Sequence, residues 1–164
     1  MGSTVQRGLL IVVIASCMIL ALWILLPDRV PPAAYEVVAV TSGDTLEVEP
    51  TNADPAPNAG APPRITVRLL GVRAPAEGEC GFEESRAYLA EGVDGVIVTV
   101  LPGDDPATHG KTIVRYVEVQ GLDVGLAQIA ESHAVADGTD HDRMELYEEA
   151  DAATPNPCEA EAAG

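Results

Sequence analysis

The residues of this chain that could do chemistry are scattered, and none belongs to a complete catalytic or metal-binding motif. The three histidines, His109, His133 and His141, lack the short helical spacing of paired zinc ligands, so surface or capping roles are expected for them. Ser85 and Ser132 stand outside any nucleophile-elbow motif, which argues against an activated serine. Zinc chemistry and serine hydrolysis are therefore disfavoured.

Clustered aspartates are the next candidates, because carboxylates are the ligands that calcium prefers. Asp104 and Asp105 are adjacent, and residues 137–142 alternate acidic residues with small ones in the manner of a calcium loop. The second stretch lacks the closing glutamate that such a loop requires. Solvated turns are the expected structure for both.

An apolar segment near the N-terminus predicts a membrane anchor. Residues 9–26 contain no charge and, as a helix, would span roughly the hydrocarbon core of a bilayer. Arg7 precedes the segment, so the positive bias places residues 1–8 in the cytoplasm and the rest of the chain outside. We expect a single-pass protein of the cell membrane, with its domain on the extracytoplasmic side.

Two alternatives to an uncleaved anchor are a cleaved secretory signal and a lipoprotein signal. Residues 23–27 offer no small-residue cleavage site. Cys17 ends a lipid-attachment box, but more apolar residues follow it where a lipoprotein turns polar. All three interpretations export the domain.

The exported part is strongly acidic. All 26 acidic residues and eight of the nine basic ones follow the apolar segment, so this part has a formal charge near −18. Such a field repels nucleic acid, which binds mainly through lysine and arginine. This composition argues against tight binding of polynucleotides. Solubility or life in high salt would also account for the charge.

The exported part holds one pair of cysteines, Cys80 and Cys158. An even pair in an oxidising compartment suggests a disulfide, and two free thiols are the alternative. On the chain-entropy model such a bridge would stabilise the fold by roughly 4 kcal/mol.

Hydrophobic patterning predicts the elements. Residues 27–34 read as a spacer, and turns or loops are expected at 42–44, 50–63, 71–81 and 102–111. Five segments are β-branched or alternate polar and apolar residues, which predicts strands at 35–40, 45–49, 64–70, 96–101 and 112–119. Three segments have helical spacing, at 82–93, 122–134 and 140–153.

Five strands with a helix after the third fit a Greek-key barrel of the oligonucleotide-binding type. The predicted fold class is therefore α+β, mainly β, with three helices and one preceding transmembrane helix. One domain, residues 35–158, is expected, and residues 159–164 form an acidic tail too small to pack.

Three motifs in this order resemble the staphylococcal nuclease (thermonuclease-like) family. They are the hairpin 40–46 around Gly43-Asp44-Thr45, the strand 67–72 that runs into Ala74-Pro75, and the helix start 121–127. Glu79-Cys80 and Pro157-Cys158 also look like the paired cysteines of exported members, and this resemblance supports the disulfide. It covers about residues 36–158.

Active members of that family bind one calcium ion and hold the attacked phosphate between two arginines. The resemblance places the first metal ligand at Asp44 and the first phosphate-binding arginine at Arg68. The second metal-binding aspartate falls on Arg73, and the glutamate that activates water falls on Ala76, with Glu77 one place later.

The second phosphate-binding arginine falls on Lys111, which keeps the charge but cannot form a bidentate clamp. Arg73, Ala76 and Lys111 thus depart from the family's pattern. Arg73 could instead form an internal ion pair with Asp44, a structural role for both.

The leading hypothesis is a catalytically degenerate domain without a cofactor, which binds an unknown envelope protein as an interaction or scaffold module. Whether the chain is an enzyme stays open. The alternative is an active calcium-dependent nuclease of DNA and RNA with a shifted ligand set. In that case Asp44 would bind Ca²⁺, Arg68, Lys111 and Glu77 would be catalytic, and Glu77 or Glu79 would swing into the vacant ligand position.

Overall fold

The computed structural model describes residues 33–51, 64–103, 108–109, 112–154 and 158. The predicted anchor at 9–26, Cys17, the acidic pair 104–105, Lys111 and the tail 159–164 lie outside these residues. In the described ranges no helix is long and apolar enough to cross a membrane. The chain divides into two units, and everything below belongs to the unit that begins at Pro32.

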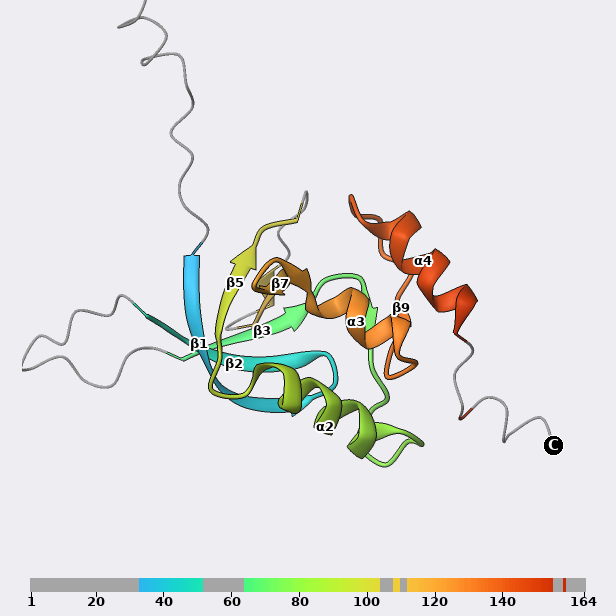
Figure 1. The fold of residues 1–164 in the computed structure, drawn as a ribbon, viewed down its shortest axis with the longest axis horizontal. Coiled ribbons are helices and arrows are strands. Elements are labelled where there is room, and N and C mark those ends of the chain that lie inside the picture. The colour runs from blue at the N-terminus through green and yellow to red at the C-terminus, as the bar shows by residue number, and fades with distance from the viewer. Residues whose placement is uncertain (1–32, 52–63, 104–107, 110–111, 155–157, 159–164) are drawn as a thin grey trace, which may run out of the picture. The chain divides into compact units, whose positions relative to one another are not determined.

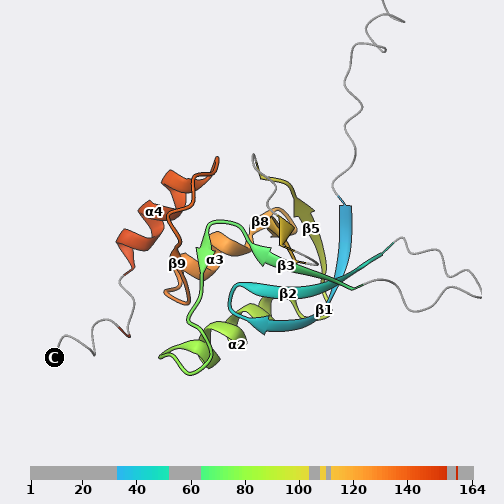
Figure 2. The same cartoon turned by 180° about the vertical axis from the view of Figure 1, so that it is seen from behind.

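Five strands form a closed barrel of the oligonucleotide-binding type (Figures 1 and 2). They are β1 (Ala33–Ser42), β2 (Thr45–Pro50), β3 (Ile65–Leu69), β5 (Ile97–Leu101) and β7 (Thr112–Val119). Neighbours pair antiparallel in the order β3-β2-β1-β5-β7. Parallel pairing of β3 with β7 then closes the ring. The predicted five-stranded barrel is therefore confirmed.

The register of β1 shifts twice, between Val37 and Ala39 and between Val40 and Ser42. Such irregularities bend and twist a strand, which lets one strand serve two partners around a curved wall. The first residues of β1, 33–36, pair with β5, whereas its second half pairs only with β2. The bend brings the β1–β2 turn to the end of the barrel beside α2.

In β2, β3 and β5 the buried side chains alternate with less buried ones, so one face of each strand fills the barrel interior. The fully buried residues include Val37, Leu46, Val48, Val67, Leu69, Val98 and Val117. Leu89 of α2 and Ile129 of α3 complete this core from outside the barrel. One continuous apolar core thus supports both helices.

Three helices pack around the barrel: α2 (Phe82–Val93), α3 (Val124–Ala130) and α4 (Met144–Ala153). The bounds of α2 match the prediction, and its buried Ser85, Leu89 and Val93 follow the helical repeat. Figures 1 and 2 show α3 between the barrel and α4. The C-terminal part of the domain therefore contacts the barrel mainly through α3.

The other two helices are shorter than predicted. Ser132 has a left-handed backbone with φ 62°, and the N–H groups of His133 and Ala134 both donate to the carbonyl of Gln128. This is the usual way for a helix to end, but a glycine normally marks it. At α4 the predicted residues 140–143 lie outside the helix.

Four two-residue strands were not predicted: β4 (Val72–Arg73), β6 (Thr108–His109), β8 (Leu122–Asp123) and β9 (Val135–Ala136). β4 lies within the segment predicted as the loop 71–81, so that prediction is wrong at 72–73. β4 pairs antiparallel with β9. This pairing holds the backbone of Arg73 in place.

Candidate functional site

Asp44 is oriented by hydroxyl groups of its own turn. It ends the tight β1–β2 turn, and its side chain is only 14% exposed. The hydroxyls of Ser42 and Thr45 donate to its Oδ1 at 2.7 and 2.8 Å. One carboxylate oxygen is thereby occupied before any ligand arrives.

Arg68 forms an ion pair with the other carboxylate oxygen of Asp44, Oδ2. Arg68 projects outward between the buried residues Val67 and Leu69, and it pairs in register with Thr45 beside the turn. Its Nε lies 3.5 Å from Asp44 Oδ2. The ion-pair partner of Asp44 is therefore Arg68, and the expected pair of Asp44 with Arg73 is wrong.

Arg73 is exposed and follows the buried Val72 in β4. Among the described residues, no carboxylate lies within ion-pair distance of Arg73. In the following loop, Glu79 accepts a hydrogen bond from the N–H of Ala76 at 2.8 Å, so its carboxylate closes a local turn. Arg73 therefore offers an uncompensated positive charge.

These side chains line one cleft of about 500 Å³. Its walls include the Asp44 turn, Arg68, and the segment from Arg73 to Glu79. Six positions that the sequence singled out therefore come together, namely Asp44, Arg68, Arg73, Ala76, Glu77 and Glu79. Lys111 lies outside the described residues.

The charges in this cleft suit a calcium ion poorly. Calcium takes about six to eight oxygen ligands, several of them carboxylates. Here the oxygens of Asp44 are engaged, Glu79 bonds to the backbone, and Arg73 adds a cation. Within the described part of the chain, no three His, Cys, Asp or Glu residues are grouped so that they could hold a metal.

No protein-family model matches this chain, and no curated protein matches it. The resemblance to the staphylococcal nucleases therefore remains a proposal.

A buried amide supports the Asp44 turn from below. Gln128 of α3 is fully buried, and its Nε2 donates to the carbonyls of Gly43 and Ser85 at 2.5 and 3.2 Å. Gly43 leaves no room for a side chain, because a Cβ there would lie 1.7 Å from Ser85 Oγ. Sequence reasoning missed Gln128, although an amide on the apolar face of a helix is a usable signal.

The remaining predicted candidates take structural roles in separate places. Ser85 is fully buried, so it cannot meet a substrate. The ring of His133 stacks on Tyr88 with centroids 4.3 Å apart. His141 Nδ1 accepts from the N–H of Arg143 at 3.2 Å in the turn before α4, although α4 itself has no side-chain cap. The side chain of His109 lies outside the described residues.

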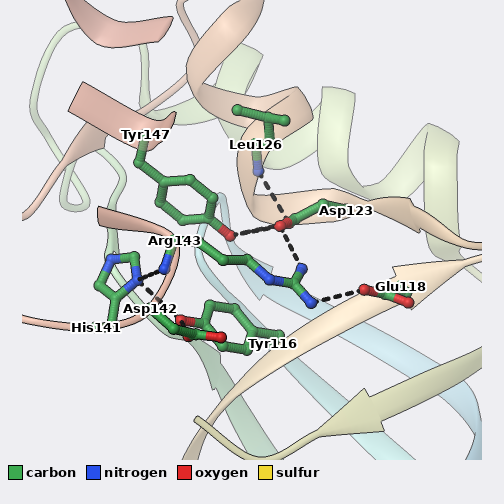
Figure 3. Close-up of polar contacts among 8 residues, drawn as sticks. All are labelled: Tyr116, Glu118, Asp123, Leu126, His141, Asp142, Arg143 and Tyr147. Carbon is green, nitrogen blue, oxygen red and sulfur yellow. Dashed lines mark hydrogen bonds and ion pairs between the residues drawn. The ribbon is translucent and has the colours of Figure 1, made fainter. Parts of the chain in front are cut away.

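A second polar cluster, which sequence reasoning did not anticipate, fastens α4 to the barrel (Figure 3). Arg143 donates to Asp123 Oδ2 at 2.6 Å and to Glu118 Oε1 at 2.8 Å. Its guanidinium also lies 4.2 Å from the centre of the Tyr116 ring. Arg143 thus connects β7, the start of α3 and the start of α4.

Two tyrosine hydroxyls complete this cluster. Tyr147 donates to Asp123, which also accepts from the N–H of Leu126 and so caps α3. Tyr116 donates to Asp142. Burial raises the pKa of Tyr147, and Asp123 raises it further. Burial and the hydrogen bond to Asp142 do the same for the pKa of Tyr116. Neither phenol can act as a base near neutral pH.

These raised pKa values predict a loss of stability in alkali. An unfolded tyrosine titrates near pH 10. Below that pH both states hold the phenol proton, so each tyrosine makes its full contribution to the free energy of unfolding. Above it the unfolded state releases its proton first, so the free energy of unfolding should fall by about 1.4 kcal/mol per pH unit for each tyrosine.

Urea unfolding at several pH values between about 9 and 12 measures this slope. Tyr147→Phe should flatten it, because one titrating phenol is gone. An unchanged slope in Tyr147→Phe would show that this tyrosine does not couple folding to pH.

Proposed function

We propose that this domain is a staphylococcal nuclease-like barrel that has lost metal-dependent catalysis. It acts instead as an interaction module, held at the outer face of the membrane by residues 9–26. The closed barrel, the position of α2 after the third barrel strand, and the gathering of the motif residues in one cleft support the family resemblance.

The position of Arg73 is the observation that carries the proposal. By resemblance, this position should supply the second carboxylate to calcium, and Arg73 lines the same cleft as Asp44. A fixed cation opposes a divalent ion by Coulomb repulsion even at a screened, surface-like dielectric. Asp44 already has Arg68 and two hydroxyls as partners. A single engaged carboxylate does not make a metal site.

The charge of the chain supports a partner other than nucleic acid. The formal net charge of −17 repels a polyanion, and the described walls of the cleft hold three carboxylates against two arginines. A protein of the cell envelope is therefore the proposed partner.

An active calcium-dependent nuclease remains the second candidate, because Glu77 lines the cleft with Asp44. Among the described residues, Glu77 has no hydrogen-bond or ion-pair partner, whereas Glu79 is engaged. Glu77 is thus the carboxylate that a shifted ligand set would use.

Calcium titration of the full chain by calorimetry, in zwitterionic nanodiscs, tests the proposal. Wild type and Asp44→Asn should give the same calcium titration, because Asp44 is not expected to bind calcium. Arg73→Asp combined with Ala76→Glu restores the two carboxylates that the resemblance implies at these positions, and it should gain calcium affinity by roughly tenfold or more, about 1.4 kcal/mol. Adding Asp44→Asn to that variant should remove the gain. Wild-type binding that depends on Asp44 would favour the active nuclease.

A further inference from the structure

A second, smaller pocket lies between α2 and the segment from β8 to α3. Its volume is about 260 Å³, and it shares no residue with the cleft around Asp44. Its walls are mostly apolar, with Leu89 and Val93 on one side and Val124 and Ala127 on the other. Pockets for whole small molecules measure roughly 300–1,000 Å³. This one is sized for a single bulky side chain.

Leu122 stands at the rim of this pocket and is 73% exposed, the largest exposed fraction among the exposed large hydrophobic residues described. The turn before it, Gln120-Gly121, has positive φ at both residues, the geometry of a tight two-residue hairpin. The tight turn therefore positions the backbone of Leu122. An exposed apolar residue at a defined position beside an apolar pocket provides a surface on which a partner could bury apolar groups.

Gly92 of α2 is one of the residues that line the pocket. It lies in the last turn of α2, where glycine is less favourable than alanine. A Cβ at this position would meet nothing within 4 Å, so no packing constraint in the described structure explains the glycine. Because Gly92 lines the pocket, we expect a large side chain at this position to fill part of it.

Two carboxylates line this pocket, Glu91 and Asp123. Asp123 is already paired with Arg143, whereas Glu91 has no ion-pair partner among the described residues. Burial raises the pKa of Tyr88, another lining residue, and the carboxylates of Glu131 and Glu91 raise it further. α2 and α3 carry no basic residue in their last turns, and the one arginine of α2, Arg86, pairs with Glu83. The rim therefore favours a cationic partner.

We propose that this pocket docks a basic segment of a partner protein, which inserts one leucine-like or aromatic side chain beside Leu122 and sets lysine or arginine against Glu91 and Glu131. This inference rests on the proposed interaction function and gives the chemistry of its partner. The chain's own acidic residues 159–164 are unsuitable occupants, because like charges would meet at the rim.

Binding of labelled synthetic peptides to the full chain in zwitterionic nanodiscs tests the proposal by fluorescence anisotropy, with empty nanodiscs as the blank. The probe is a ten-residue peptide with a central phenylalanine flanked by lysines. A serine-centred and a glutamate-flanked version should each bind roughly tenfold or more weakly. Added salt should weaken binding of the basic probe.

Two pairs of variants locate the binding site. Gly92→Phe should plug the pocket and abolish binding, whereas Gly92→Ala should leave it intact. Glu91→Lys should weaken binding, whereas Glu148→Lys makes the same charge change on the exposed face of α4 and should not. Because Glu91 is exposed, its replacement tests the site even if Gly92→Phe misfolds.

Equal binding by Glu91→Lys and wild type, or no preference for the apolar centre, would overturn the inference. Concentration-dependent dimers that Leu122→Ser dissolves would also overturn it, because a second copy would then occupy the pocket. The calcium titration is independent of this result. If the chain binds neither the peptide nor calcium, the proposed docking of a basic segment is wrong, whereas the proposed loss of catalysis still stands.

Discussion

Replacing Cys80 and Cys158 with serine is expected to lower the free energy of unfolding by about 4 kcal/mol. The two residues form a disulfide across 78 positions, with Cα atoms 5.9 Å apart. In the chain-entropy model, a bridge over so long a loop removes many conformations from the unfolded state. It joins the loop before α2 to the chain beyond α4, so its loss releases the C-terminal end of the domain from that loop.

Urea unfolding of the full chain measures this effect, with the reduced wild type as the matched control. Reduced wild type and Cys80→Ser/Cys158→Ser should unfold at the same urea concentration, because both lack only the bridge. A difference between oxidised and reduced wild type below about 1 kcal/mol would mean that the reduced unfolded chain is already restricted.

Arg143→Met should cost about 3 kcal/mol, because it leaves two poorly exposed carboxylates without a cation. The side chain of Asp123 is 11% exposed and that of Glu118 is 21% exposed. Removing one partner of a poorly exposed ion pair destabilises the protein by more than the intact pair stabilised it, because the remaining carboxylates stay desolvated without a counter-charge. The contact of Arg143 with the Tyr116 ring is lost as well.

Arg86→Met provides the comparison, because Arg86 pairs with Glu83 on the surface of α2 at 2.7 Å. Exposed pairs contribute about 0–1 kcal/mol, so this variant should unfold nearly as wild type does. Equal losses for the two variants would show that the Arg143 cluster behaves as an ordinary surface pair. Amide hydrogen exchange should also show faster exchange in α4 of Arg143→Met.

Periodicity alone predicted the barrel and α2, because long β-branched strands and one amphipathic helix give strong local patterns. The ends of α3 and α4 depended on tertiary features. Ser132 takes a left-handed conformation that glycine usually occupies. His141 and Asp142 contact Tyr116 of β7 before α4 begins, a contact that no local pattern indicates.

The resemblance to the staphylococcal nucleases implied that Asp44, Arg68 and Arg73 belong to one site, and all three line one cleft. The partner of Asp44 could not be predicted, since it depends on register. The pairing of Thr45 with Arg68 sets Arg68 beside the turn. The partner of Gln128 could not be predicted either, because its hydrogen bond to Gly43 spans 85 positions of the chain.

The most direct test of lost catalysis is the release of acid-soluble nucleotides from single-stranded DNA and RNA by the full chain in nanodiscs, with calcium and with chelator. Asp44→Asn, which removes the one retained metal-ligand candidate, is the control. We expect no release above that of Asp44→Asn at high protein concentration, from protein shown to be folded and disulfide-bonded. Calcium-dependent release by wild type that Asp44→Asn lacks would contradict the account and identify an active nuclease with a shifted ligand set.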